Sequence, residues 1–391
     1  MKIVILSAAP KSSATKSIIE AGENRNHEMT VLNPAYLYLI VSDAVNGYDR
    51  IYNGYDKHDK PVRIKANEID AVISRIGSNL AYGTAVLQHF KENLNIFSTQ
   101  SPEAIKIASD KLLSLQKISA EKLKVPKTVI ADKGIHLDWM LKQIGGLPAI
   151  AKILRGSQGI GVMILESKLQ TNTTLETFYK QKTKLLLQQY IDANAKDIRA
   201  IVIDGKVVTA MERTAPKNDI RANISLGGSG KKVILSEEDK DICIRSASAC
   251  GLEVAGVDIM KDSYGTTYVI EVNGNYGYKI EEITGDDIST PLIKYCERNA
   301  GNKGERKSGE AEGRKQAHIS NEVNDRPTIR EMFSNLTYWI AQDYVNTSNK
   351  EFKKLFNTVN FGLANGTTLK DEVYEDYENL QLKLAVSINL R

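Results

Sequence analysis

The chain has 391 residues, 26% of them charged and 42% hydrophobic, which is ordinary for a globular protein and long enough for two or three domains. Its formal net charge of +4 is too small to indicate a nucleic-acid partner. The three cysteines show no metal or redox spacing, and no stretch is long enough to span a bilayer. We therefore expect a cytoplasmic protein without a membrane or nucleic-acid partner.

Residues 1–100 predict a small parallel α/β domain. Short apolar runs and one amphipathic segment give a strand–helix–strand order, which is typical of a parallel sheet. Residues 36–60 are rich in Tyr, Asp, Asn and Gly and predict a long loop or an irregular hairpin. The other predicted strands span residues 2–8, 29–32, 69–75 and 96–98, and the predicted helices span 16–26 and 83–93.

A second unit over residues 101–183 carries a lysine and a glycine loop. Asp110 is placed to cap a helix that begins at Lys111. Lys152 lies inside an apolar strand and needs an anionic partner there. The run from Gly156 to Gly161 follows, and three glycines among six residues allow backbone N–H groups to approach a phosphate. A plain hairpin turn is the alternative reading of this run.

The third unit, residues 184–300, begins with an apolar strand that ends in Gln188, Gln189, Tyr190 and Ile191, which is a candidate purine site. Asp204-Gly205 then predicts a hairpin between strands 197–203 and 206–213. The second strand ends at Arg213, and Arg221 and Asn223 follow. Cations at a strand exit can hold a phosphate or a carboxylate.

The last hairpin of this unit carries a candidate metal site. Residues 255–260 and 268–273 predict two buried strands, with Asp258 roughly opposite Glu271 and Asn273 on the same face. Carboxylate and amide oxygens suit a hard cation such as Mg²⁺. Two acids at the solvated edge of a hairpin remain the alternative.

After residue 300 the composition changes. Gly, Lys, Glu, Ser and Asn dominate residues 301–326, which predicts a linker. An apolar stripe at helical spacing follows, so residues 327–391 predict a helical appendage. The appendage would recruit a peptide substrate or cap an oligomer, and we expect a homo-oligomer.

In its first three quarters the chain resembles the RimK-type ATP-grasp ligases, which add glutamate to a peptide carboxyl terminus. Each motif is weak alone, but the ordered set is specific. The motifs are Met1–Ser7, Arg75-Ile76-Gly77, Tyr82-Gly83-Thr84, Ser109–Leu112, Ala151-Lys152, Gly156–Val162, Gln188–Ile191, Asp197-Ile198-Arg199, Glu212-Arg213, Ala255–Ile259 and Glu271-Val272-Asn273. The resemblance implies an α/β, ATP-grasp fold: a small parallel N-terminal α/β domain and two α+β subdomains that clasp ATP, followed by the helical appendage.

The resemblance also implies residue roles. Lys111 and Lys152 would hold the ATP phosphates. Arg213 would stabilise an acyl-phosphate, with Arg221 and Asn223 facing the acceptor or the intermediate. Asp258, Glu271 and Asn273 would bind two Mg²⁺ ions, with Mn²⁺ as an alternative. The remaining nucleotide-binding residues would be Gly156, Ser157, Gln158, Gly159, Ile160 and Gly161 over the phosphates, Gln188, Gln189, Tyr190 and Ile191 beside adenine, and Asp197 and Arg199.

The implied activity is ATP-dependent joining of a peptide or protein carboxylate to the amine of an amino acid such as glutamate. One departure concerns specificity, because Asn273 is followed by Gly274-Asn275-Tyr276-Gly277 where the family usually has Ala-Ser-Pro-Gly. That segment faintly resembles ATP-grasp ligases that macrocyclise ribosomal peptides. A macrocyclase that links groups within a precursor peptide is therefore one alternative hypothesis. A non-catalytic ATP-binding regulator on the same scaffold is another, because a fold alone does not establish catalysis.

Overall fold

The computed structural model describes residues 1–41, 50–55, 61–131, 136–154, 156, 161–217, 219, 221–301 and 350–365, and the single residues 373, 376, 377 and 380. The chain forms two compact units, residues 1–302 and 303–391. In the second unit, helix α12 (Lys350–Asn365) is described, whereas the predicted linker from residue 302 onward and the apolar stripe lie outside the described residues. No helix among the described residues combines the length and the apolar character that crossing a bilayer requires.

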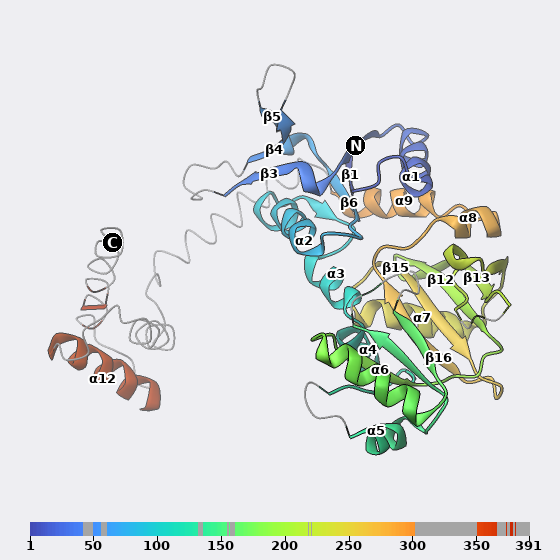
Figure 1. Ribbon diagram of the computed structural model, residues 1–391. Helices are drawn as coiled ribbons and strands as arrows, with labels where there is room; N and C mark the ends of the chain where they lie inside the picture. Colours follow the sequence, from blue (N-terminus) through green and yellow to red (C-terminus); the bar gives the residue numbers. More distant parts are fainter. Residues whose placement is uncertain are drawn as a thin grey trace. The chain divides into compact units, whose positions relative to one another are not determined.

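The first unit begins with the predicted parallel sheet (Figure 1), whose strand order is β2-β1-β6-β7. These strands are β1 (Lys2–Ser7), β2 (Glu28–Leu32), β6 (Ala71–Arg75) and β7 (Phe97–Ser98). Helix α1 (Ser13–Glu23) starts three residues before the predicted start, because the Ser12 hydroxyl accepts a hydrogen bond from the N–H of Thr15 and caps the helix. Helix α2 (Leu80–Gln88) continues into a π-helical turn, His89–Asn93.

The segment predicted as a loop or irregular hairpin forms a small antiparallel sheet. Its strands are β3 (Leu37–Ile40), β4 (Arg50–Tyr55) and β5 (Pro61–Ile64). Along β3, Leu37 is buried whereas Tyr38 and Ile40 are exposed. The hairpin alternative was therefore the better reading, since apolar residues alternate with exposed ones through this segment.

The central part contains helices α3 (Pro102–Ser109), α4 (Lys111–Ala120), α5 (Leu137–Ile144) and α6 (Lys168–Lys180). Its antiparallel sheet has the order β10-β9-β11-β8, formed by β8 (Thr128–Val129), β9 (Ala149–Ile153), β10 (Val162–Leu165) and β11 (Leu185–Gln189). Asp110 caps α4 as predicted, and its carboxylate accepts from the N–H groups of Leu112 and Leu113. Strand β8 is short, because only Thr128 and Val129 pair with β11.

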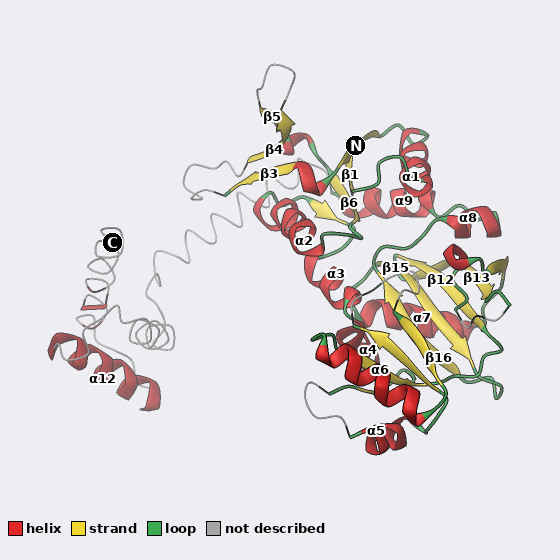
Figure 2. Cartoon of the chain, in the orientation of Figure 1, coloured by secondary structure: helices red, strands yellow, loops and turns green. Residues whose placement is uncertain are grey.

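A five-stranded antiparallel sheet with the order β14-β13-β12-β15-β16 follows (Figure 2). Its strands are β12 (Lys196–Ile203), β13 (Lys206–Thr214), β14 (Ser229–Lys232), β15 (Val254–Lys261) and β16 (Thr267–Asn273). Asp204 and Gly205 make the predicted turn, with φ values of +53° and +66°. The short strand β14 pairs with the outer edge of β13.

Helices α7 (Glu237–Ala249), α8 (Lys279–Thr284) and α9 (Ser289–Asn299) complete the first unit. The alternation along β12 shows how the sheet is used. Ala200 and Val202 lie in a core with Cys243 and Ala247 of α7. Asp197 and Arg199 instead lie on the opposite face of the sheet, because side chains alternate along a strand.

Candidate active site

One pocket gathers most of the residues that the sequence marked as functional. Its walls come from β9 and β11 of the four-stranded sheet and from β12, β13, β15 and β16 of the five-stranded sheet. The predicted residues that line it are Lys111, Lys152, Gly156, Gln188, Gln189, Tyr190, Ile191, Asp197, Arg213, Arg221, Asn223, Asp258 and Glu271. Gly161, Arg199 and Asn273 do not line it, and Ser157, Gln158, Gly159 and Ile160 lie outside the described residues.

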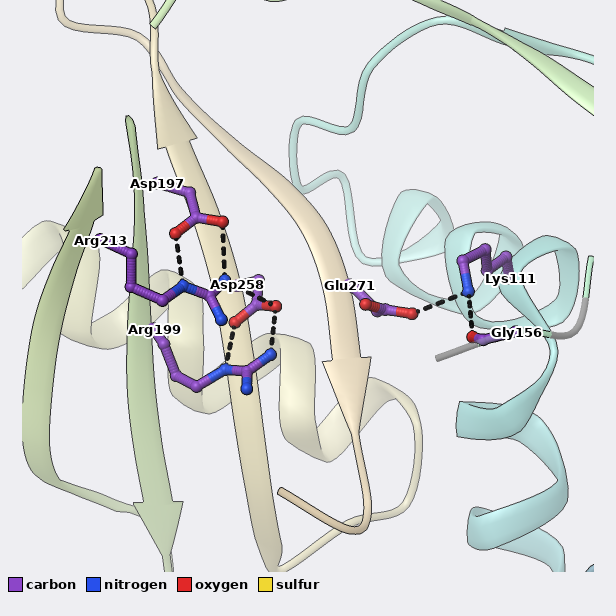
Figure 3. Close-up of polar contacts among 7 residues, drawn as sticks. All are labelled: Lys111, Gly156, Asp197, Arg199, Arg213, Asp258 and Glu271. Carbon is purple, nitrogen blue, oxygen red and sulfur yellow. Dashed lines mark hydrogen bonds and ion pairs between the residues drawn. The ribbon is translucent and has the colours of Figure 1, made fainter. Parts of the chain in front are cut away.

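Four charged side chains alternate in sign along the five-stranded sheet (Figure 3), and three of them, Asp197, Arg213 and Asp258, line the pocket. Arg213 donates to both oxygens of Asp197 at 2.6 Å and approaches Asp258 at 3.1 Å. Arg199 donates to both oxygens of Asp258 at 2.7 and 2.6 Å. The strand register produces this arrangement, because it pairs Asp197 with Arg213 and Arg199 with Asp258, and directly opposite residues share a face.

Burial makes these ion pairs interdependent. The side chain of Arg213 is only 3% exposed and that of Asp258 7%. Burial opposes ionisation of Asp258, but the two guanidinium groups outweigh it and hold the pKa of this carboxyl below its ordinary value. Burial also opposes the charged form of Arg213. Asp258 and Asp197 nevertheless raise the pKa of its guanidinium, so this group stays charged. Burial instead raises the pKa of the Asp197 carboxyl above its ordinary value, although the Arg213 guanidinium opposes that shift.

A second ion pair joins Lys111, at the N-terminal end of α4, to Glu271. The Lys111 ammonium lies 3.0 Å from a Glu271 carboxylate oxygen and donates to the carbonyl oxygen of Gly156 at 2.8 Å (Figure 3). The contact ties the first residue of α4 to β16 and to the start of the glycine loop. A phosphate bound here would meet an ammonium already held in place, which lowers the entropy cost of binding.

Lys152 meets the expectation that a lysine in an apolar strand sits near anions. It lies on β9 between Val162 of β10 and Leu186 of β11. Burial lowers its pKa to about 8, the Glu271 carboxylate opposes that shift, and the Lys111 charge adds to it. A partly buried ammonium of this kind is stabilised when an anionic ligand enters the pocket.

The other end of the pocket is less charged. The Gln188 side-chain amide donates to the Thr128 hydroxyl at 2.8 Å, and the Gln189 side-chain oxygen accepts from the N–H of Lys127 at 3.3 Å. Both predicted side-chain amides therefore form hydrogen bonds, one with β8 and the other with the residue directly before it. Apolar lining residues that sequence reasoning missed include Ile150 and Val162. Ile150 lies two residues before Lys152, so the two-residue period of a strand could have found it.

The candidate metal ligands fit a hard cation in chemistry and register. Asp258 pairs directly with Glu271, as predicted, and Asn273 lies two residues further along β16. Among the described residues the side-chain nitrogen of Asn273 is buried without a hydrogen-bond partner, and its side-chain oxygen is the atom that could bind a cation. Both Asp258 oxygens are held by arginines, and no cluster of three His, Cys, Asp or Glu side chains occurs among the described residues. A cation would therefore have to share Asp258 with Arg199 and Arg213.

Comparisons with known proteins show the family to which this chain belongs. The model of the RimK PreATP-grasp domain matches residues 1–105, and the model of the RimK-like ATP-grasp domain matches residues 108–296. A Nitrosococcus oceani protein named "probable alpha-L-glutamate ligase" is 37% identical over 306 residues, which cover 77% of this chain and 96% of that protein. The matches span the first unit and stop before the appendage.

Two solved structures share the fold. The ATP-grasp ligase PsnB, complexed with a phosphomimetic variant of a minimal precursor, Mg and ADP, has a TM-score of 0.59 and 19% identity, covering 77% of this chain and 98% of PsnB. The macrocyclase MdnC from Microcystis aeruginosa, bound with precursor peptide MdnA, has a TM-score of 0.57 and 15% identity, covering 76% of this chain and all of MdnC. The chain therefore belongs to the RimK-like ATP-grasp family and is an ATP-dependent ligase, as its ordered motifs predicted.

Proposed function

We propose that this protein uses ATP and Mg²⁺ to join the carboxylate of a peptide or protein to the amine of an amino acid, with ADP and phosphate as the other products. The observation that carries the proposal is the composition of one pocket, where Lys111, Lys152 and Arg213 converge around Asp258 and Glu271. Phosphoryl transfer needs positioning and neutralisation of charge rather than a protein nucleophile, and these residues supply both.

The proposed reaction proceeds in two steps. In the first, a carboxylate oxygen attacks the γ-phosphorus of ATP, the bond to the β,γ-bridging oxygen breaks, and ADP leaves as an acyl-phosphate forms. In the second, the amine nitrogen attacks the acyl carbon, phosphate leaves with the bonding pair, and the nitrogen loses a proton. Arg213 faces the pocket from β13, where its fixed charge would stabilise the transferred phosphoryl group.

The remaining residues take positioning roles. Lys111 and Lys152 would hold the phosphates from α4 and β9, and the apolar wall with Ile150 and Val162 would accommodate the adenine ring. Arg221 and Asn223 line the pocket beyond Arg213, where the substrate carboxylate would lie. Asp258, Glu271 and Asn273 would hold the metal, which supplies charge neutralisation of the phosphates when bound.

The similarity to proteins named "probable alpha-L-glutamate ligase" makes glutamate the reference amine substrate for any assay. The macrocyclase alternative differs in the substrate, since there both reacting groups belong to one precursor peptide. Mass spectrometry of products from ATP, Mg²⁺, a peptide library and the twenty amino acids separates the two. A peptide heavier by one amino-acid residue supports the proposal, whereas a peptide lighter by one water and without an added residue supports the macrocyclase.

A further inference from the structure

The segment that follows Asn273 is held by residues from the N-terminal part of the chain. Gly274, Asn275 and Tyr276 each form a hydrogen bond with a residue that precedes helix α3. Asn273 is the last residue of β16, so this segment leads directly away from the candidate metal site. The contacts that fix the segment therefore bear on the position of Asn273.

Gln100 makes the first of these contacts from a buried position between β7 and α3, where it is 5% exposed. Its side-chain nitrogen donates to the carbonyl oxygen of Gly274 at 2.6 Å and to that of Val254 at 2.8 Å. Val254 is the first residue of β15, so one amide joins the end of β16 to the start of the neighbouring strand. These two strands carry the candidate metal ligands Asp258 and Glu271.

Arg75, the last residue of β6, makes the other contacts. Its guanidinium donates to the carbonyl oxygen of Tyr276 at 2.7 Å, and the Asn275 side-chain nitrogen donates to the Arg75 carbonyl oxygen at 3.4 Å. The guanidinium also lies 5.2 and 5.1 Å from the ring centroids of Tyr276 and Tyr278, which stack on each other. Both tyrosines are buried, so Arg75 joins β6 to a fixed part of the core.

Close packing leaves the segment little room to move. A Cβ added to Gly77 would lie 2.3 Å from the Asn275 side-chain nitrogen, and a Cβ added to Gly256 would lie 2.9 Å from the Cβ of Tyr276. Gly256 is the residue of β15 that pairs with Asn273. Tyr276 therefore packs against the backbone directly opposite Asn273.

The segment also borders the candidate metal site. Gly274 and Asn275 line one pocket together with Glu271 and Asn273. The affinity of a protein for a metal depends on the neighbouring groups that orient each ligand, as well as on the ligands themselves. The hydrogen bonds of Gln100 and Arg75 are such orienting contacts for Asn273.

We propose that Gln100 and Arg75 are positioning residues for the candidate metal site. Through the carbonyl oxygens of Gly274 and Tyr276 they fix the segment after β16, and this segment fixes Asn273 relative to the cation. The inference rests on the proposed function, which places a metal beside Asn273. Neither positioning residue lines the pocket of the candidate active site, so each acts through the backbone that it holds.

The test measures the affinity for Mn²⁺, a paramagnetic substitute for Mg²⁺ with the same preference for oxygen ligands. Electron paramagnetic resonance follows free Mn²⁺ during titration of the full-length protein with an equimolar non-hydrolysable ATP analogue. The variant Gln100→Met keeps the length of the side chain but cannot donate either hydrogen bond. Its Kd for Mn²⁺ should rise at least about tenfold, as is typical when a group that orients a metal ligand is removed. Its affinity for the analogue in EDTA should stay within about twofold of the wild-type value, because the lysines for the phosphates are unchanged.

Arg75→Met tests the same segment through a different bond and decides the question should Gln100→Met not fold. Its Kd for Mn²⁺ should also rise at least about tenfold. Arg75→Lys keeps a hydrogen-bond donor and a cation beside the rings, and it should raise the Kd less than Arg75→Met does.

Thr209→Val is the control for loss of a hydrogen bond by a buried residue elsewhere in the same sheet. The Thr209 hydroxyl donates to Asp286 at 2.8 Å, and Thr209 lies outside the pocket of the candidate active site. Its replacement should leave the Kd for Mn²⁺ unchanged.

A Kd within about twofold of the wild-type value in the folded Gln100→Met and Arg75→Met proteins overturns the inference and leaves the proposed function in place. A rise in Thr209→Val as large as theirs has the same consequence. Wild-type protein that binds no Mn²⁺ beyond what the analogue binds alone overturns the metal assignment, and with it the proposed function.

Discussion

Asp258 and Glu271 lie directly opposite each other on β15 and β16, yet their carboxylates are held by different cations. Arg199 and Arg213 hold Asp258 on the side of β12 and β13, whereas Lys111 holds Glu271 on the side of α4. The paired strands β15 and β16 therefore connect the part of the pocket that holds the arginines to the part that holds Lys111.

Removal of the Glu271 charge should stop turnover. The variant Glu271→Gln keeps the shape of the side chain but weakens its bond to a metal, so ADP release with Mg²⁺ should fall on the order of a thousandfold. Glu282→Gln, at an exposed position of α8, is the control and should behave as the wild type. Near wild-type ADP release by a folded Glu271→Gln protein would remove Glu271 from the metal site.

Arg213 should be necessary for stability as well as for chemistry. Arg213→Ala leaves the buried carboxylates of Asp197 and Asp258 with one fewer cation, and loss of one partner from a buried ion pair typically costs about 3–5 kcal/mol. Arg298→Ala breaks the exposed pair with Asp204 and should cost less than about 1 kcal/mol. Urea unfolding measures the free energy of unfolding of each variant. Equal decreases in the two variants would show that the buried ion pairs of Arg213 stabilise the protein no more than the exposed pair of Arg298 does.

The pKa of Lys152 predicts a pH dependence of nucleotide binding. Burial lowers that pKa to about 8, so the ammonium that attracts phosphate is present below pH 8 and is lost as the pH rises above it. Affinity for a non-hydrolysable ATP analogue should therefore be full near pH 7 and about tenfold weaker near pH 9.

The variant Lys152→Arg is the control for this prediction, because a guanidinium keeps its charge throughout that range and should flatten the profile. Calorimetric titrations at several pH values measure the affinities. A wild-type profile as flat as that of Lys152→Arg would show that the charge of Lys152 does not contribute to binding.

The appendage should be dispensable for nucleotide binding. The first compact unit ends at Asn302, and Ala300 is 2% exposed in a core with Leu292 and Cys296, so the cut belongs after residue 302 rather than directly after α9. The protein comprising residues 1–302 should fold and bind the ATP analogue as the full chain does. It should differ in mass in solution or in its KM for a peptide. A folded truncation that no longer binds the analogue would place the appendage in the active site.

The motifs with local physical causes could be predicted from the sequence. The Asp204-Gly205 turn follows from backbone conformations that Gly and Asp tolerate, and the pairing of Asp258 with Glu271 follows from the two-residue period of strands. Helix α6 could not be predicted in this way. Its sequence contains four threonines and few apolar residues, and only Thr171 and Leu175 of it are buried.

The electrostatic detail of the site depends on long-range pairing that a sequence does not display. Nothing local indicates that Arg199 takes both oxygens of Asp258, because the two residues are far apart in the chain and meet only through the β12–β15 register. The sequence also does not indicate that Ile76, Ala108 and Asn275 line one pocket, since they come from three separate segments. Its chemistry follows from tertiary packing alone.

The transfer of oxygen from the substrate carboxylate to phosphate tests the central claim most directly. A peptide library labelled with ¹⁸O in its terminal carboxylates is incubated with the protein, ATP, Mg²⁺ and amino acids, and the released phosphate is analysed by mass spectrometry. An acyl-phosphate mechanism predicts one ¹⁸O atom in the phosphate for each amide formed, with ADP in equal amount. Unlabelled phosphate, or release of AMP and pyrophosphate, would contradict the assignment of this pocket to carboxylate–amine ligation.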